Sequence, residues 1–186
     1  MKKIAGVDEV GRGSLIGPVY AAAVILNKSI NYKLLKDSKS LTKKKREFLA
    51  NYIKKNSIWS IGKASVQEIE KINILQASLL AMKRAIIKLE KKPSLVLIDG
   101  NKLPEIKNYK LNSVIKGDQK IPSISAASII AKVARDKMIT KLAKKFNGYN
   151  WDKNFGYGTK LHLKAIKNLG VTSHHRKNFS PISKIK

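Results

Sequence analysis

The sequence predicts an α/β domain in which a central sheet is flanked by helices. Short apolar runs typical of buried strands dominate the first third of the chain, and helical patterns dominate the remainder. A chain of 186 residues is the size of one ordinary domain, and 43% hydrophobic residues suffice for a real core. These patterns leave the order of the strands open.

The predicted strands are short, apolar and bounded by turn-forming residues. The first, Ile4–Val10, stops at a Gly-Arg-Gly sequence, and the second, Val19–Leu26, has little polar interruption. Further strands are expected at residues 57–65, at 94–98 before Asp99-Gly100, and more weakly at 111–115.

The predicted helices follow from capping residues and from the spacing of apolar residues. After a loop over 37–42, the Thr42 hydroxyl is suited to cap a helix over 43–55. Apolar residues at three- and four-residue steps predict a helix over 66–89, interrupted near Asn73. Two more helices are expected over 123–146, where serine and alanine permit close packing on a sheet, and over 159–168.

The composition indicates a polyanionic partner and excludes several classes of protein. With 34 lysines and 5 arginines against 12 acids, the net charge is +27, which favours nucleic acid as a ligand. Lysine, isoleucine and asparagine are all abundant, so part of the lysine excess reflects codon bias. The absence of cysteine excludes a disulfide scaffold, a zinc finger and a thiol nucleophile. The longest uncharged run, residues 13–27, is too short to span a membrane, so we expect a cytoplasmic protein.

Four of the acids lie at the ends of apolar segments, namely Asp8, Glu9, Asp99 and Asp118. Acids at the ends of neighbouring buried strands converge on one sheet edge, where their repulsion requires a cation. Oxygen ligands without cysteine favour Mg²⁺ or Mn²⁺. Each acid taken alone also fits a turn or a helix cap. Asp8 and Glu9 can share a site only if the strand ends or bulges there, because consecutive strand residues point to opposite faces.

Several motifs stand in order along nearly the whole chain. They include Asp8-Glu9-Val10-Gly11-Arg12-Gly13, Asp37-Ser38-Lys39, Asp99-Gly100-Asn101, Lys116-Gly117-Asp118, the serine- and alanine-rich run 125–133, Gly156-Tyr157-Gly158-Thr159 and His175-Arg176. Together they resemble the type 2 ribonucleases H, or ribonuclease HII. The related type 3 enzymes carry an added N-terminal domain and a lysine where Arg12 stands, so the resemblance favours type 2.

The resemblance implies one catalytic domain with an RNase H-like mixed sheet and helices over about residues 1–146 and a small helical extension over about 147–186. It implies an enzyme that cuts the RNA strand of RNA–DNA hybrids and nicks duplex DNA at single embedded ribonucleotides, leaving 5′-phosphates. A monomer is the default expectation for its oligomeric state. By position, Asp8, Glu9, Asp99 and Asp118 match the family's carboxylates, which would hold two divalent ions about 4 Å apart.

The resemblance also suggests contacts to nucleic acid. The backbone of Gly11, Arg12 and Gly13 would meet a ribose 2′-hydroxyl, and Tyr157 matches a tyrosine that packs on the sugar. Lys39, Lys160 and Arg176 are candidate phosphate contacts. Asp136 competes as the fourth carboxylate, although we favour an ion pair on a helix surface. Tyr149, Trp151 and Phe155 are expected in the core, and the adjacent His174 and His175 are rejected as a metal pair.

Two other classes of function are weighed against the nuclease. A non-catalytic basic RNA-binding protein of ribosomal type would suit the charge, but its acids would not cluster. A nucleotide-hydrolysing enzyme with glycine-rich phosphate-binding turns is disfavoured, because the chain contains no Gly-x-x-x-x-Gly-Lys-Ser/Thr motif.

Overall fold

A mixed five-stranded sheet of order β3-β2-β1-β4-β5 forms the centre of the computed structural model, which describes residues 3–35 and 41–184. The strands are β1 (Ile4–Val10), β2 (Val19–Leu26), β3 (Ser57–Ala64), β4 (Leu95–Asp99) and β5 (Leu111–Val114). The first three are antiparallel neighbours, whereas β4 runs parallel to both β1 and β5. The predicted fold class and all five strands are confirmed.

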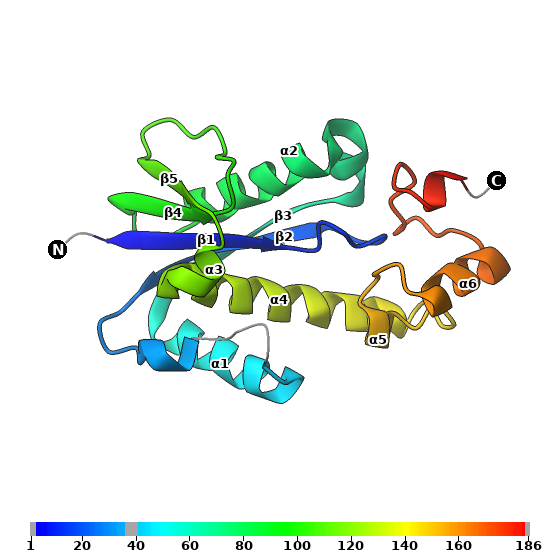
Figure 1. Ribbon diagram of the computed structural model, residues 1–186, viewed down its shortest axis with the longest axis horizontal. Coiled ribbons are helices and arrows are strands. Elements are labelled where there is room, and N and C mark those ends of the chain that lie inside the picture. Colours follow the sequence, from blue (N-terminus) through cyan, green and yellow to red (C-terminus); the bar gives the residue numbers. More distant parts are fainter. Residues whose placement is uncertain (1–2, 36–40, 185–186) are drawn as a thin grey trace.

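Helices cover both faces of the sheet (Figure 1). The helix α2 (Val66–Ile87) packs on one face, and α1 (Lys43–Lys55) and α4 (Pro122–Ala143) lie on the other. The remaining elements are η1 (Tyr32–Leu35), α3 (Gly117–Lys120), α5 (Trp151–Asn154), α6 (Lys160–Leu169) and η2 (Ile182–Lys184). The sequence patterns do not predict α3 and α5, because a single turn is too short to reveal a period. No helix in the described ranges is both long and apolar enough to cross a membrane.

Small residues allow α4 to lie directly on the sheet. A Cβ atom at Gly6 of β1 would lie 2.2 Å from the carbonyl carbon of Ser123, which leaves no room for any side chain there. On α4, Ala126, Ala127 and Ala131 are completely buried. The predicted close packing of the serine- and alanine-rich helix is therefore confirmed, and it brings the polar residues of α4 close to the end of β1.

The helix starts agree with the capping residues of the sequence. The Thr42 hydroxyl accepts a hydrogen bond from the Lys45 N–H at 3.4 Å, so Thr42 caps α1 as predicted. The predicted interruption of α2 is also confirmed at Asn73, where φ is 64° and ψ is 168°. Its side-chain oxygen accepts the N–H groups of Leu75 and Gln76 at 2.9 and 3.2 Å, so Asn73 caps the second part of the helix.

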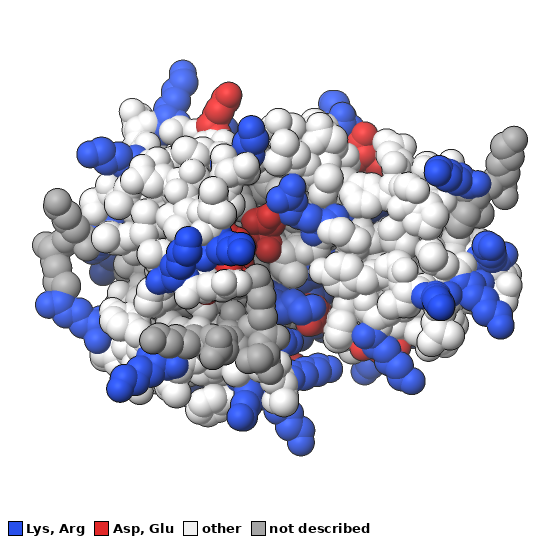
Figure 2. Space-filling view, in the orientation of Figure 1, with Lys and Arg blue, Asp and Glu red and all other residues white. Residues whose placement is uncertain are grey.

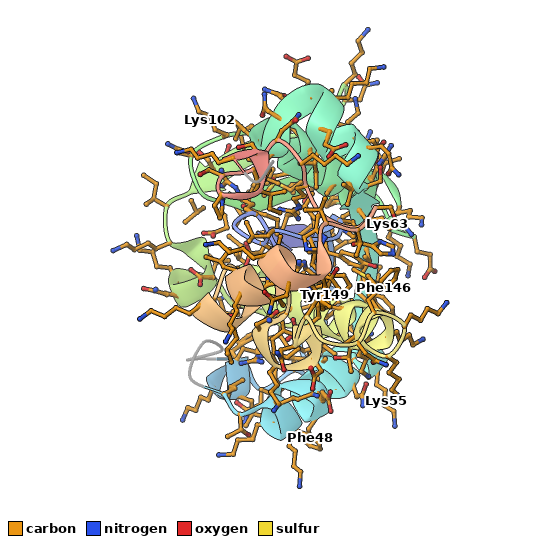
Figure 3. All side chains as sticks on the ribbon, turned by 90° about the vertical axis from the view of Figure 1, so that its right-hand side faces the viewer. Phe48, Lys55, Lys63, Lys102, Phe146 and Tyr149 are labelled. Carbon is orange, nitrogen blue, oxygen red and sulfur yellow. The ribbon has the colours of Figure 1, made fainter. Side chains whose placement is uncertain are left out.

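The C-terminal segment packs against one end of the core through an apolar and aromatic cluster. Figure 3 looks onto this end, where Phe146 and Tyr149 are labelled and lysines project outwards around the molecule. The rings of Phe146 and Tyr149 lie 5.6 and 4.8 Å from that of Trp151, which is completely buried. Leu15 and Ile16 of the β1–β2 loop belong to the same cluster. The cluster also includes Phe155, so the expected core positions of Tyr149, Trp151 and Phe155 are confirmed.

Candidate active site

The structure brings the four predicted carboxylates together in one cavity. Asp8, Glu9, Asp99 and Asp118 line a cavity of about 330 Å³ at the carboxyl ends of β1 and β4. These strands are parallel, so their carboxyl ends meet at the same edge of the sheet. Figure 2 shows acidic side chains near the centre of one face, with lysines and arginines around them. Clustered acids contradict the alternative of a basic RNA-binding protein, which predicts scattered ones.

Asp8 and Glu9 share this cavity at the end of β1. Regular pairing of β1 with β2 continues to Val10, so the alternative of a bulge is wrong, whereas the strand does end at Val10, one residue after Glu9. The pairing of β1 with β4 instead ends at Val7, opposite Ile98. Among the described residues, no strand pairs with β1 beyond Val7 on that side, so the edge of β1 next to Glu9 is open towards the cavity.

Hydrogen bonds fix the two strand-end aspartates. Asp8 Oδ1 accepts the N–H of Glu9 at 2.7 Å, and the Ser128 hydroxyl on α4 donates to the same carboxylate. Asp99 Oδ1 accepts the N–H of Gly117 at 2.7 Å. Because Gly117 begins α3, this bond anchors the turn that carries Asp118, which is only 7% exposed.

The electrostatics of the cavity favour a cation. Burial raises the pKa of Asp8 well above its ordinary value, the charges of Glu9 and Asp99 raise it further, and the bond from Ser128 opposes them. Burial also raises the pKa of Glu9, against the lowering effect of Arg12. A donor set made of carboxylate oxygens fits a hard divalent ion. Among the described residues, no three acids or histidines lie close enough to enclose an ion as they stand, as expected for carboxylates that repel one another.

Three further polar residues line the cavity that were not predicted as site residues, namely Arg46 of α1 and Ser128 and Lys132 of α4. Ser128, Lys132 and Asp136 follow one another at four-residue steps, so they form a polar stripe on one face of α4. This stripe was the available signal for α4. For Arg46 the available signal was that the chain contains only five arginines, so each of them stands out among the lysines.

Asp136 lies outside the carboxylate cavity. It lines a neighbouring cavity beside α1, and its Oδ1 lies 2.8 Å from Lys132 Nζ. The expected ion pair is therefore present, but at a buried position, since Asp136 is only 7% exposed.

Of the predicted nucleic-acid contacts, Arg12 lies beside one of the carboxylates. Arg12 is exposed, and its Nη1 lies 3.2 Å from Glu9 Oε1. The exposed Gly13 faces Tyr157, whose Cε1 is 4.0 Å from where a Cβ of Gly13 would stand. Gly11 is buried, and Lys160 is exposed at the start of α6. Lys39 lies outside the described residues.

Arg176 does not occupy the position expected of a phosphate contact. Its side chain is completely buried, with Nε donating to the Gly17 carbonyl and Nη1 to the Arg12 carbonyl, both at 2.9 Å. The expected direct contact is wrong for this structure because the guanidinium is enclosed by protein. Arg176 instead supports the loop from which Arg12 projects.

Comparison with known proteins identifies the family of the chain. The family model described as Ribonuclease HII matches residues 5–182. A ribonuclease HII from Pelagibacter ubique (strain HTCC1062) is 80% identical over 183 residues, which cover 98% of each chain.

Two solved structures are similar over almost their whole length. The ribonuclease H2 of Pyrococcus horikoshii OT3 matches with a TM-score of 0.81 at 28% identity, covering 98% of this chain and 96% of that one. The RNase HII of Archaeoglobus fulgidus, solved in a complex with PCNA, matches with a TM-score of 0.80 at 27% identity, covering 96% and 95%. With this fold, these matches and four acids at one sheet edge, the chain belongs to the ribonuclease HII family, the metal-dependent endoribonucleases that act on RNA in RNA–DNA hybrids.

Proposed function

We propose that this enzyme also nicks duplex DNA at single embedded ribonucleotides. The observation that carries the proposal is the pairing of exposed Gly13 and Tyr157 beside the carboxylates, linked to them by the contact of Arg12 with Glu9. A glycine leaves its backbone amide and carbonyl accessible to a ribose 2′-hydroxyl, and an aromatic ring can pack on the same sugar. Because both groups act on one nucleotide, a single ribose suffices for recognition.

The donor set supports catalysis with two divalent ions, Mg²⁺ or Mn²⁺. Asp8 and Asp99, on adjacent strand ends, would serve as central ligands, and Glu9 and Asp118 would complete one ion each. When bound, the ions would activate the attacking water and stabilise the leaving 3′-oxygen, giving a 5′-phosphate on the product. The raised pKa values of Asp8 and Glu9 support this assignment, since burial and the charges of neighbouring carboxylates disfavour ionised groups there, and a bound cation would offset both effects.

The cations around the carboxylates would hold the substrate backbone. Arg46 and Lys132 line the cavity itself, where they can neutralise phosphate charge next to the cleaved bond. Lys160 and the wider lysine-rich surface would add binding that does not depend on sequence.

All four carboxylates of the site come from one chain, so one copy supplies the whole ligand set. On this ground we propose a monomeric enzyme. Its nucleic-acid substrate supports a cytoplasmic location.

Cleavage of labelled duplexes tests the proposal. Three substrates of one sequence are compared, namely a continuous RNA–DNA hybrid, a DNA duplex with one ribonucleotide, and an all-DNA duplex. Each is incubated with Mg²⁺, Mn²⁺ or EDTA. We expect cleavage of the first two substrates with either metal, 5′-phosphate ends on the products, and no cleavage of the third. Cleavage of the hybrid without nicking at the single ribonucleotide would overturn the proposal.

A further inference from the structure

Two of the five arginines are enclosed by protein close to the predicted ribose-reading groups. Arg135 on α4 and Arg176 near the C-terminus both have no exposed surface. No ion pair to either one is present in the part of the chain that the structure describes. Their guanidinium groups donate instead to backbone carbonyls, which is an unusual use of a buried charge.

Most of these carbonyls belong to one loop. Arg176 donates to Arg12 and Gly17, as described above. Arg135 donates to the carbonyls of Ile16 at 3.0 Å and Pro18 at 3.3 Å. Residues 12–18 therefore face two guanidinium groups along the connection between β1 and β2.

Arg135 also reaches the turn that carries Tyr157. Its Nη1 donates to the Phe155 carbonyl at 3.1 Å, and its guanidinium carbon lies 5.9 Å from the centre of the Tyr157 ring. A Cβ at Gly11 would lie 2.2 Å from Arg135 Nε. One side chain thus packs directly behind Gly11 and beside Tyr157, the two ends of the proposed ribose contact.

Backbone hydrogen bonds join the same three segments. The Leu15 N–H donates to the Gly156 carbonyl at 2.8 Å, and the Arg176 N–H donates to the Leu15 carbonyl at 2.9 Å. The Gly17 N–H donates to the His174 carbonyl at 2.8 Å. The β1–β2 loop, the Tyr157 turn and the C-terminal segment therefore form one assembly with the two guanidinium groups inside it.

The chemistry of arginine makes this assembly stiff. A guanidinium is planar and holds its donors in fixed directions, so each bond constrains the position of its carbonyl. Burial lowers the pKa of Arg135. Burial together with the charge of Arg135 lowers the pKa of Arg176 to about 9, so Arg176 remains charged at neutral pH. Arg176 Nη2 is buried and has no hydrogen-bond partner among the described residues, so the loss of a further carbonyl would leave this buried charge with still fewer bonds, which is unfavourable.

We propose that Arg135 and Arg176 are positioning residues that hold Gly11–Gly13 and Tyr157 in the relative geometry needed to receive one ribose. The inference rests on the proposed function, in which these two groups read the sugar. Neither arginine touches the substrate in this view, and their effect on cleavage is transmitted through the loop and the turn.

The test uses Arg135→Lys and Arg176→Lys, which keep the positive charge and remove the planar guanidinium with its fixed hydrogen-bond donors. Single-turnover cleavage and the Kd are measured on the single-ribonucleotide duplex. We expect each variant to lose at least about tenfold in cleavage rate at saturating enzyme, while its Kd stays within about threefold of the wild-type value. The matched control is Ile86→Ala, which opens a cavity in the core on the other face of the sheet and should lower thermal stability without changing the cleavage rate.

A second arm asks whether Arg135 acts through the tyrosine. In a Tyr157→Ala background, Arg135→Lys should lower the rate by a clearly smaller factor than it does in the wild type, because one of the two groups that it positions has already been removed. Rate losses that simply multiply would contradict the proposal, as would wild-type rates in both lysine variants.

The remaining outcomes separate this inference from the proposed function. Normal nicking by Tyr157→Ala would overturn the proposed function itself. Impaired nicking by Tyr157→Ala with rates in the lysine variants equal to the Ile86→Ala control would overturn the inference alone. If a lysine variant does not fold by circular dichroism, Ser14→Ala replaces it, since the Ser14 hydroxyl donates to the Ile16 and Phe155 carbonyls within the same assembly. Wild-type nicking by that variant would count against the proposal.

Discussion

The indole Nε1 of Trp151 donates a hydrogen bond of 2.9 Å to Nε2 of His162. An indole nitrogen can only donate, so His162 must accept at Nε2 and carry its proton on Nδ1. That proton then points to the carbonyl of Tyr157, 2.9 Å away. His162 is thus fixed as a neutral imidazole below the turn that carries Tyr157, and protonation at Nε2 would break its bond to Trp151.

The first prediction is that acid destabilises the fold through this histidine cluster. Burial lowers the pKa of His175 to about 4 and also lowers that of His162, whereas an unfolded histidine titrates near 6.5. The folded-state pKa values lie below the unfolded ones, so the stabilising contribution is complete above about pH 6.5 and is lost as the pH falls towards 4. For His175 the loss is on the order of 2 kcal/mol after allowance for solvent screening. Urea unfolding between about pH 7.5 and 4.5 measures it.

The control for this prediction is His175→Asn, which keeps an acceptor for the Thr172 N–H that His175 Nδ1 accepts at 2.9 Å. Burial also raises the pKa of Asp8, and the comparison of the two proteins removes the contribution of such carboxylates to the acid dependence. The variant should lose less stability than the wild type over the acid range. Equal losses would show that His175 is not the source.

The second prediction concerns the strand-end carboxylates. Asp8→Asn and Asp99→Asn should each lower the cleavage of hybrid by roughly 100-fold or more, because each removes a charge that the ions require. Hybrid binding should change little, since the lysine-rich surface still holds phosphates. Cleavage rate and Kd are measured on the same proteins at one fixed salt concentration. Near-normal turnover in Asp99→Asn would move the site elsewhere.

The third prediction separates ring packing from hydroxyl chemistry at Tyr157. Tyr157→Ala should lower single-turnover nicking at one ribonucleotide by about tenfold or more, with much less effect on affinity, because the ring positions the sugar and adds little net binding. Tyr157→Phe keeps the ring and should retain most of the rate. A Phe variant as slow as the Ala variant would assign the role to the hydroxyl, and normal nicking by Tyr157→Ala would make this tyrosine a packing residue.

The fourth prediction tests the interruption of α2. Asn73→Ala should lower the free energy of unfolding by about 2 kcal/mol, because it removes the cap and leaves a β-carbon at a left-handed φ without the side-chain hydrogen bonds that hold the asparagine there. Asn73→Gly removes the cap but relieves the backbone, so its loss should be smaller. Urea unfolding measures the free energy of unfolding of both variants. An Ala variant more stable than the Gly variant would contradict the prediction.

Regular periodicity made most of the fold predictable. The strand Val19–Leu26 is buried on both faces and apolar throughout, and the long helices repeat their apolar residues over several turns. The turn that carries Asp118 has no such signal, because α3 is only four residues long. Its position is fixed by a hydrogen bond from the Gly117 N–H to Asp99 of β4. Its position depends on tertiary contacts that sequence patterns do not contain.

The site could be predicted from the sequence only where an acidic residue stands at the end of an apolar segment. Asp8 and Asp99 close apolar runs, so their convergence followed from the topology of parallel strands. The way in which Glu9 reaches the cavity did not follow, because it depends on how far β4 extends beside β1. Arg176 was misassigned for a related reason, since a basic residue in a lysine-rich chain looks like a surface contact until its burial is known.

No substitution of Gly6 is expected to stabilise this enzyme, because the backbone of α4 lies directly against it. Even alanine there would push the helix away from the strand, and that helix carries Ser128 and Lys132. A methyl group at Gly6, two residues from Asp8, would thus move one wall of the catalytic cavity. We expect this change to lower activity even in a protein that still folds. We therefore expect glycine at position 6 to vary less among related enzymes than many exposed residues that contact the substrate. A neighbouring residue can replace a surface contact, whereas only glycine leaves room for the helix at this position.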